Sequence, residues 1–163
     1  MVLPPATLKV DLIVVGAGPA GLFMALNAGS TGKSLLILEK NTTPGKKLLL
    51  SGSGQCNLTH TGHIQDFFSH YGNQGDFLKP ALLAFDNQAL MQFFELSGVR
   101  LTENPQGKVF PASGNARDIL NCLLEHVVNQ KNVQLRLKEP VQKIVFLPGA
   151  YPYQVFSDQG IYL

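Results

Sequence analysis

The feature that most constrains the fold of this chain is a glycine motif with the spacing G-x-G-x-x-G, formed by Gly16, Gly18 and Gly21. It follows the apolar run Leu12–Val15, whose β-branched residues suit a buried parallel strand. A helix-like segment comes next, and then a second apolar run, Leu35–Leu38, which ends in Glu39. This order predicts a Rossmann-like βαβ unit in an α/β protein: strand, glycine turn, helix, strand and acid.

Each part of the motif has its own role in binding a dinucleotide. Gly16 permits the sharp turn, Gly18 lets a pyrophosphate approach the backbone, and Gly21 lets the helix pack closely on the sheet. Pro19 suits a first helical turn, where its missing N–H has no partner to lose. The carboxylate of Glu39 can accept both hydroxyls of an adenosine ribose and would repel a 2′-phosphate. The motif by itself does not separate FAD from NAD.

The segment 41–62 is too rich in glycine and serine to be regular structure throughout. It offers cations and backbone N–H groups that can wrap a cofactor, whereas the alternative is an ordinary flexible surface loop. Cys56, His60 and His63 lie close together there, but Cys-x3-His-x2-His does not match the usual spacing of structural zinc ligands. We therefore predict no metal site.

Composition sets broader limits on the function. A chain of 163 residues can bury one core and the start of a second, and a net charge of +2 suggests neither a nucleic acid nor a membrane partner. No apolar run is long enough to span a bilayer, and the N-terminus has no signal-peptide pattern. Cys56 and Cys122 are far apart, which predicts free thiols in a cytoplasmic protein.

The remaining pattern changes after Pro140. Before it we expect helices over parts of 76–98 and after Asn115, with short strands near 99–102, 108–110 and 133–137. After it, short apolar runs at 141–147, 153–157 and 161 onward predict an antiparallel meander. We therefore expect a dinucleotide-binding domain over 1–140 and the incomplete start of a β-rich inserted domain over 141–163. Since the chain stops in the third strand, we expect an unfinished sheet.

Three motifs resemble those of a known family. Val15–Leu22 together with Glu39 and Lys40 is similar to the FAD-binding turn of two-dinucleotide-domain flavoproteins. Gly45–Thr59 resembles the Ser-Gly-Gly-Gly-Arg-Cys-Asn-Leu-Thr region of bacterial NAD(P)/FAD-dependent oxidoreductases of the aminoacetone oxidase-like or bile-acid reductase-like type. Gly107–Ser113 resembles the Gly-Arg-Val-Phe-Pro motif of the same family.

The resemblance implies that the Ser-Gly … Cys-Asn-Leu-Thr loop lies towards the flavin and that the strand from Val141 passes the adenine. The candidate cofactor-binding residues are Gly16, Gly18, Pro19, Ala20, Gly21, Glu39, Lys40, Lys46, Lys47, Ser51, Gly52, Asn57, Thr59 and Val141. No catalytic residue is identified. The chain departs from the family at Lys46 and Gln55, where arginine is usual, at Ser53, where glycine is usual, and at His60, where asparagine is usual.

We therefore interpret the chain as the FAD-binding domain of a flavin-dependent oxidoreductase, with NAD(P) as an electron donor in the complete enzyme. Family members continue well past residue 163, so we expect a truncated protein that binds FAD poorly, does not turn over and self-associates through its terminal strands. The alternatives are a single-domain NAD-binding dehydrogenase and a non-enzymatic nucleotide-binding remnant.

Overall fold

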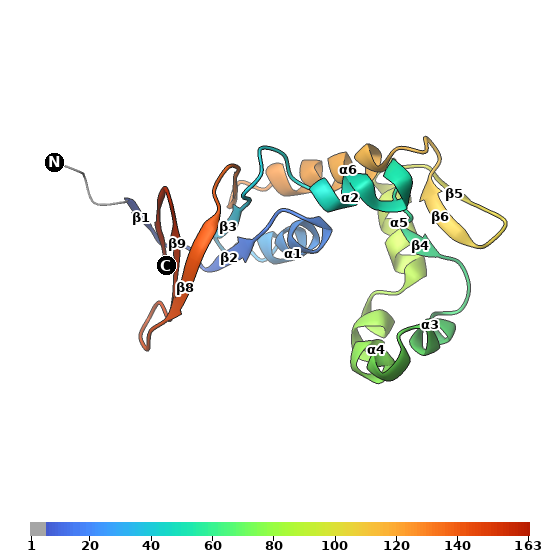
Figure 1. Ribbon diagram of the computed structural model, residues 1–163, viewed down its shortest axis with the longest axis horizontal. Helices are drawn as coiled ribbons and strands as arrows, with labels where there is room; N and C mark the ends of the chain where they lie inside the picture. Colours follow the sequence, from blue (N-terminus) through green and yellow to red (C-terminus); the bar gives the residue numbers. More distant parts are fainter. Residues whose placement is uncertain (1–5) are drawn as a thin grey trace. The chain divides into compact units, whose positions relative to one another are not determined.

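The computed structural model describes residues 6–163, which divide into two compact units. The first contains residues up to Lys47 and from Leu123 to Leu163, and the second contains Leu48–Cys122. The two boundaries fall within helices α2 (Lys46–Leu50) and α6 (Ala116–Val128) (Figure 1). Met1–Pro5, part of the lead expected to be extended and loosely held, lie outside the described residues.

The first unit is built on a parallel sheet. Strands β2 (Leu12–Val15), β3 (Leu35–Leu38) and β7 (Val133–Arg136) are hydrogen-bonded in the order β2-β3-β7. All four residues of the central strand β3 are buried, as expected for an apolar strand covered on both faces. Helix α1 (Pro19–Gly29) connects β2 to β3 and contacts both strands. The predicted α/β class and βαβ unit are confirmed.

A second sheet in this unit has the order β1-β10-β9-β8, from strands β1 (Ala6–Leu8), β8 (Val141–Phe146), β9 (Tyr153–Ser157) and β10 (Gly160–Tyr162). The predicted antiparallel meander is confirmed for β8, β9 and β10. The expectation that the last strand leaves the sheet unfinished is wrong, because β1 pairs in parallel with β10 along its other side. The edges of this sheet are therefore β1 and β8.

The two sheets of the first unit share a core. Leu36 and Leu38 of β3 form a buried cluster with Val155 of β9 and Tyr162 of β10. Val141, at the start of β8, is half-buried against the same cluster. The meander thus packs on the parallel sheet in this chain, whereas its role as the start of an inserted domain, with a boundary at residue 140, stays a prediction.

The second unit contains a small antiparallel sheet of β4 (Thr59–His60), β6 (Lys108–Pro111) and β5 (Leu101–Glu103), in that order. Its helices are α3 (Ile64–His70), α4 (Gly75–Ala84) and α5 (Asn87–Leu96). Short 3-10 segments are η1 (Ser51–Gly54) and η2 (Gly72–Gln74). None of the helices in the described chain is long and apolar enough to cross a membrane.

Local signals predicted some of these elements and missed others. Asp86, a residue type favoured at the N-cap, caps α5, its Oδ1 accepting the N–H of Ala89 at 2.8 Å. Pro80, a residue type that favours the first turn of a helix, lies in the interior of α4. The segment 41–62 contains the short elements α2, η1 and β4 with irregular backbone before and between them, so the prediction that it is not regular structure throughout is confirmed.

Candidate functional site

The three motif glycines are required for different reasons. Gly16 adopts a left-handed φ of +99°, which side-chain-bearing residues rarely adopt. A Cβ at Gly21 would collide with the carbonyl oxygen of Gly16. Gly18 has an ordinary φ of −80°, and a Cβ there would meet nothing within 4 Å in the described chain. Neither a left-handed φ nor a neighbouring atom requires glycine at this N-cap position, and the space beside its backbone is open.

The N-terminus of α1 lies beside this space, and no side chain caps it within the described chain. Gly18 is its N-cap and makes no side-chain capping bond within the described chain, and Pro19 is in the first helical turn. Ala20 is exposed, and no acidic residue lies in that turn. Because the first N–H groups of a helix and its dipole favour negative charge, this end of α1 suits a diphosphate.

Glu39 follows β3 and lies at the same carboxyl edge of the parallel sheet. Only 6% of it is exposed, and its Oε2 accepts the N–H of Ala17 at 2.8 Å. Its Oε1 accepts the main-chain N–H of Asn41 at 2.8 Å and the Nδ2 of the same residue at 2.6 Å. The acid is therefore fixed to the glycine turn and to the loop that follows β3.

These contacts keep Glu39 ionised. Burial raises the pKa of its carboxyl, but the hydrogen bonds from Asn41 and Ala17 together with the charge of Lys40 more than offset this, so that its pKa lies below the ordinary value. Ala17 and Asn41 were not among the predicted site residues. Ala17 contributes only a backbone N–H, which leaves no side-chain signal, whereas an amide two residues after a carboxylate is a detectable local pattern.

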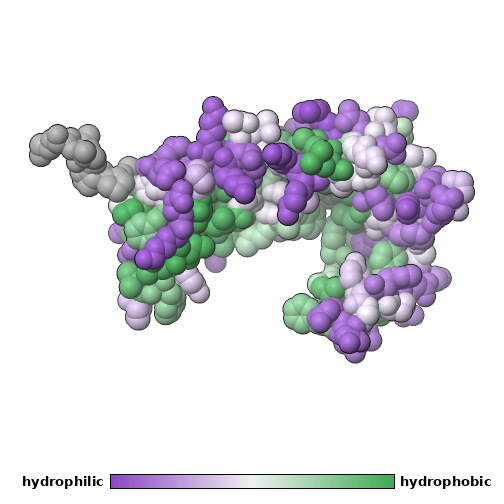
Figure 2. Space-filling view, in the orientation of Figure 1, coloured by the Kyte–Doolittle hydropathy of each residue, from purple (hydrophilic) through white to green (hydrophobic). Residues whose placement is uncertain are grey.

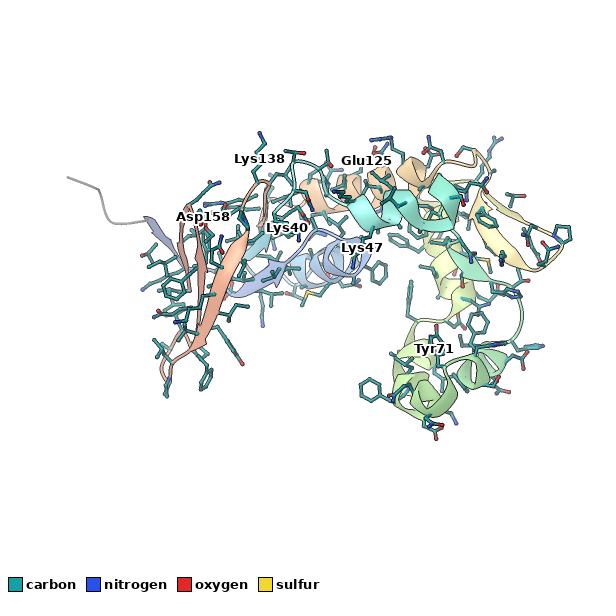
Figure 3. All side chains as sticks on the ribbon, in the orientation of Figure 1. Lys40, Lys47, Tyr71, Glu125, Lys138 and Asp158 are labelled. Carbon is teal, nitrogen blue, oxygen red and sulfur yellow. The ribbon has the colours of Figure 1, made fainter. Side chains whose placement is uncertain are left out.

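Three exposed lysines belong to the loop after β3 and the start of α2: Lys40, Lys46 and Lys47. Figure 3 labels Lys40 and Lys47. The loop returns to the glycine turn, where the N–H of Gly45 donates to the carbonyl of Ala17 at 2.8 Å. This contact and the one from Glu39 use both backbone groups of Ala17, so the turn is held from two directions.

The other loop candidates, Ser51, Gly52, Asn57 and Thr59, belong to the second unit. Gly52 and Ser53 both have left-handed φ values, of 54° and 56°, and a Cβ at Gly52 would lie 2.8 Å from the N of Asn57. Two successive left-handed residues make a tight turn here, a conformation that Gly52 adopts easily and that is unfavourable for Ser53. Thr59 is paired with Val109 in the sheet of this unit.

Cys56 and His60 in this loop contact other parts of the protein. Cys56 is free and 2% exposed, and burial raises the pKa of its thiol despite a hydrogen bond from Ser51. The two ring nitrogens of His60 lie 2.6 Å from the carbonyls of Thr61 and Gln106. No cluster of three metal-ligating side chains occurs in the part of the chain that the structure describes.

The chain is similar to one protein family and to several curated proteins. A family described as "HI0933-like protein Rossmann domain" matches residues 10–152. The chain is 29% identical over 136 residues to the ribosomal RNA dihydrouridine synthase of Escherichia coli, which covers 83% of this chain and 33% of that protein. It is 31% identical over 120 residues to the 3-dehydro-bile acid delta(4,6)-reductase of Clostridium scindens, covering 72% of this chain and 29% of that enzyme. The chain thus spans about a third of the length of these relatives.

Solved structures share the fold at low sequence identity. The open conformation of a flavocytochrome c3 fumarate reductase superimposes with a TM-score of 0.72 at 18% identity, covering 97% of this chain and 32% of that one. The 3-ketosteroid-delta4-(5alpha)-dehydrogenase of Rhodococcus jostii RHA1 gives 0.67 at 15% identity, covering 94% and 44%. At these identities the similarity establishes the architecture alone.

Proposed function

Because the chain belongs to the family of HI0933-like Rossmann domains, we propose that it binds FAD through the glycine turn and Glu39, as a domain of a flavin-dependent oxidoreductase. The predicted family is confirmed by the match over residues 10–152. In this proposal the turn from Gly16 to Gly21 holds the diphosphate, and Glu39 accepts the ribose hydroxyls.

The observation that carries the proposal is the open space at Gly18. Gly18 has an ordinary φ, and nothing in the described residues lies within 4 Å of the position that a Cβ would take, so a ligand can approach the backbone closely there. The space lies at the N-terminus of α1, where an anion is stabilised. The ionised Glu39, tied to Ala17 at 2.8 Å, follows the neighbouring strand and suits a ribose without a 2′-phosphate.

Bound FAD would supply hydride or electron transfer at its isoalloxazine ring, and the protein would supply binding and orientation. Lys40, Lys46 and Lys47 would offset phosphate charge. Ser51, Gly52, Asn57 and Thr59 are proposed to lie towards the flavin, and Val141 towards the adenine.

The relatives suggest a reaction class for a complete enzyme built on this domain. Their names, dihydrouridine synthase and delta(4,6)-reductase, both denote addition of hydrogen across a carbon–carbon double bond. We propose this class, with NAD(P) as electron donor. The name of the Escherichia coli relative includes ribosomal RNA. For this chain, the net charge of +2 predicts no nucleic acid partner, and the absence of such a partner stays a prediction.

A cytoplasmic location is part of the proposal, supported by Cys56 and Cys122, two buried cysteines that form no disulfide in the described chain. Self-association is another part, now assigned to β8 because the last strand β10 is paired on both sides. Ile144 and Phe146 of β8 and Tyr153 of β9 are 54%, 62% and 57% exposed, and hydrophobic surface lies over part of the region of these strands (Figure 2). Light scattering should detect a dimer or larger species, which Phe146→Ser reduces. A monomer at all concentrations would contradict this part.

The proposal is tested by titrating the protein with FAD and following flavin fluorescence. We expect Gly18→Val to raise the dissociation constant by at least about tenfold because its side chain fills the diphosphate space. Met24→Val, at an exposed position of the same helix, serves as a control that adds a β-branched residue away from the site. Thermal unfolding of both variants shows whether the fold survives.

Calorimetric titrations with FAD, NAD and ADP separate the alternatives. Preference for NAD over FAD would favour a single-domain dehydrogenase, and binding of ADP with no binding of flavin would favour a nucleotide-binding remnant. Unchanged FAD affinity in folded Gly18→Val would refute the diphosphate assignment.

A further inference from the structure

A buried polar cluster lies behind the candidate site and has no role in the proposed function. Its centre is Glu139, which is 1% exposed. One carboxylate oxygen accepts hydrogen bonds from the hydroxyl of Ser157, at 2.7 Å, and from the hydroxyl of Tyr162. Arg136 donates from Nη1 to the same Tyr162 hydroxyl at 2.9 Å. The other oxygen of Glu139 has no hydrogen-bond partner within residues 6–163.

This cluster is connected to Glu39 through two successive backbone groups. The N–H of Lys138 donates to the carbonyl of Asn41 at 3.0 Å, and the N–H of Glu139 donates to the carbonyl of Glu39 at 2.8 Å. Lys138 has a left-handed φ of 57°, an unfavourable conformation for a residue with a side chain. The loop after β7 is thus strained, and it is bonded to the loop that carries the ribose acid. Figure 3 labels Lys40 and Lys138 in these two loops.

We infer that Glu139 is a positioning residue for the adenosine end of the site. Its side chain fastens the loop after β7 to β9 and β10, through Ser157 and Tyr162. The backbone of that loop fixes the carbonyls of Glu39 and Asn41, and Asn41 in turn holds the carboxylate of Glu39 with two N–H groups. Glu139 itself touches no ligand in this scheme, which rests on the proposed role of Glu39 as the ribose acceptor.

A buried carboxylate such as that of Glu139 is not needed to hold β9 and β10 together. A buried carboxylate with one oxygen unpaired is an unfavourable way to join β9, β10 and a loop, because apolar packing would do so without desolvating a charge. The left-handed Lys138 adds a second unfavourable feature at the same place. Both are accounted for when the loop must hold the carbonyl of Glu39 in one position.

The test uses two probes that reach different parts of the site. ADP carries the adenosine and the diphosphate, whereas inorganic pyrophosphate reaches only the glycine turn. We expect Glu139→Ala to raise the dissociation constant for ADP about tenfold, the effect of losing roughly one charged hydrogen bond, and to leave that for pyrophosphate unchanged. Glu139→Gln keeps an oxygen acceptor for Ser157 and Tyr162 and should restore most of the ADP affinity. Asp158→Ala removes an exposed carboxylate from the same hairpin and is the matched control.

Amide hydrogen exchange gives a second measurement that does not depend on a ligand. The N–H groups of Lys138 and Glu139 should exchange faster in Glu139→Ala, while those of β3 keep their protection. If that variant does not fold, Tyr162→Phe, which removes only the bridging hydroxyl, should show the same selective loss of ADP affinity to a smaller extent.

The outcomes separate this inference from the proposed function. Equal losses for ADP and pyrophosphate would mean a general structural role, and unchanged ADP affinity would mean no role at the site; either result overturns the inference and leaves the FAD proposal standing. If the wild-type protein binds neither probe, both the proposed function and the inference fail.

Discussion

Glu39 accepts the main-chain N–H of Ala17 at 2.8 Å, across 22 residues of sequence. This bond joins the acid after β3 to the glycine turn after β2, so the two parts of the candidate site are held in a fixed relation before any ligand arrives. Such preorganisation lowers the cost of binding, because fewer groups need to be ordered.

Removing this acid should therefore affect both binding and the turn. We expect Glu39→Ala to weaken ADP binding by on the order of 1–3 kcal/mol, because a charged hydrogen-bonding partner of the ribose is lost. Calorimetry measures the change, with Glu125→Ala on the exposed face of α6 as control (Figure 3). A loss too small to measure would place Glu39 outside the site.

The lowered pKa of Glu39 predicts a pH dependence of stability. Since its hydrogen bonds hold the folded pKa below the ordinary value of 4.5, the unfolded chain takes up this proton at higher pH than the folded chain. The stabilisation is present above that value and is lost as the pH falls through the folded pKa. Urea unfolding of Glu39→Gln should show a flatter acid limb than the wild type, and parallel limbs would contradict the assignment.

Substitution by alanine should reduce stability at Gly21 and ADP binding at Gly18. Gly21→Ala places a methyl group against the carbonyl oxygen of Gly16, and we expect a loss of roughly 1–3 kcal/mol in the free energy of unfolding. Gly18→Ala meets nothing within 4 Å in the described chain and should change stability little while weakening ADP binding. Denaturant unfolding and calorimetry on both variants provide the comparison, in which a large stability loss at Gly18 would be the contrary result.

Ser53 stands where the resembling family has glycine, and it adopts a left-handed φ of 56°. Ser53→Gly should stabilise the protein by about 0.5–1 kcal/mol, because relief of left-handed strain exceeds the added entropy of the unfolded chain. Ser30→Gly, at a φ of −63°, should instead destabilise it. If thermal unfolding shows Ser53→Gly less stable than the wild type, the serine side chain makes a favourable contribution at that turn.

The thiol of Cys56 should react slowly with alkylating reagents at neutral pH, since burial both covers it and raises its pKa. Mass spectrometry should find two alkylated cysteines after denaturation without reduction, because neither forms a disulfide in the described chain. Rapid labelling of native Cys56, or a mass consistent with a bridge to Cys122, would contradict this prediction.

The sequence by itself determined the βαβ unit, the bounds of β2 and β3 and the separate roles of Gly16 and Gly21. These depend on local properties: β-branched apolar runs, a φ that only glycine adopts easily, and the helix start at Pro19. The cap of α5 at Asp86 was predictable for the same reason, since its hydrogen bond closes within three residues.

Only the tertiary structure decided which distant groups meet. The pairing of Ala6 with Gly160 completes a sheet that the sequence suggested was unfinished, and the contacts of Glu139 with Ser157 and Tyr162 have no local pattern. Hydrogen bonds between residues far apart depend on how the strands are ordered in a sheet, and hydrophobic periodicity does not encode that order. For this reason the sequence identified the acid at Glu39, whereas the fold determined what holds it in place.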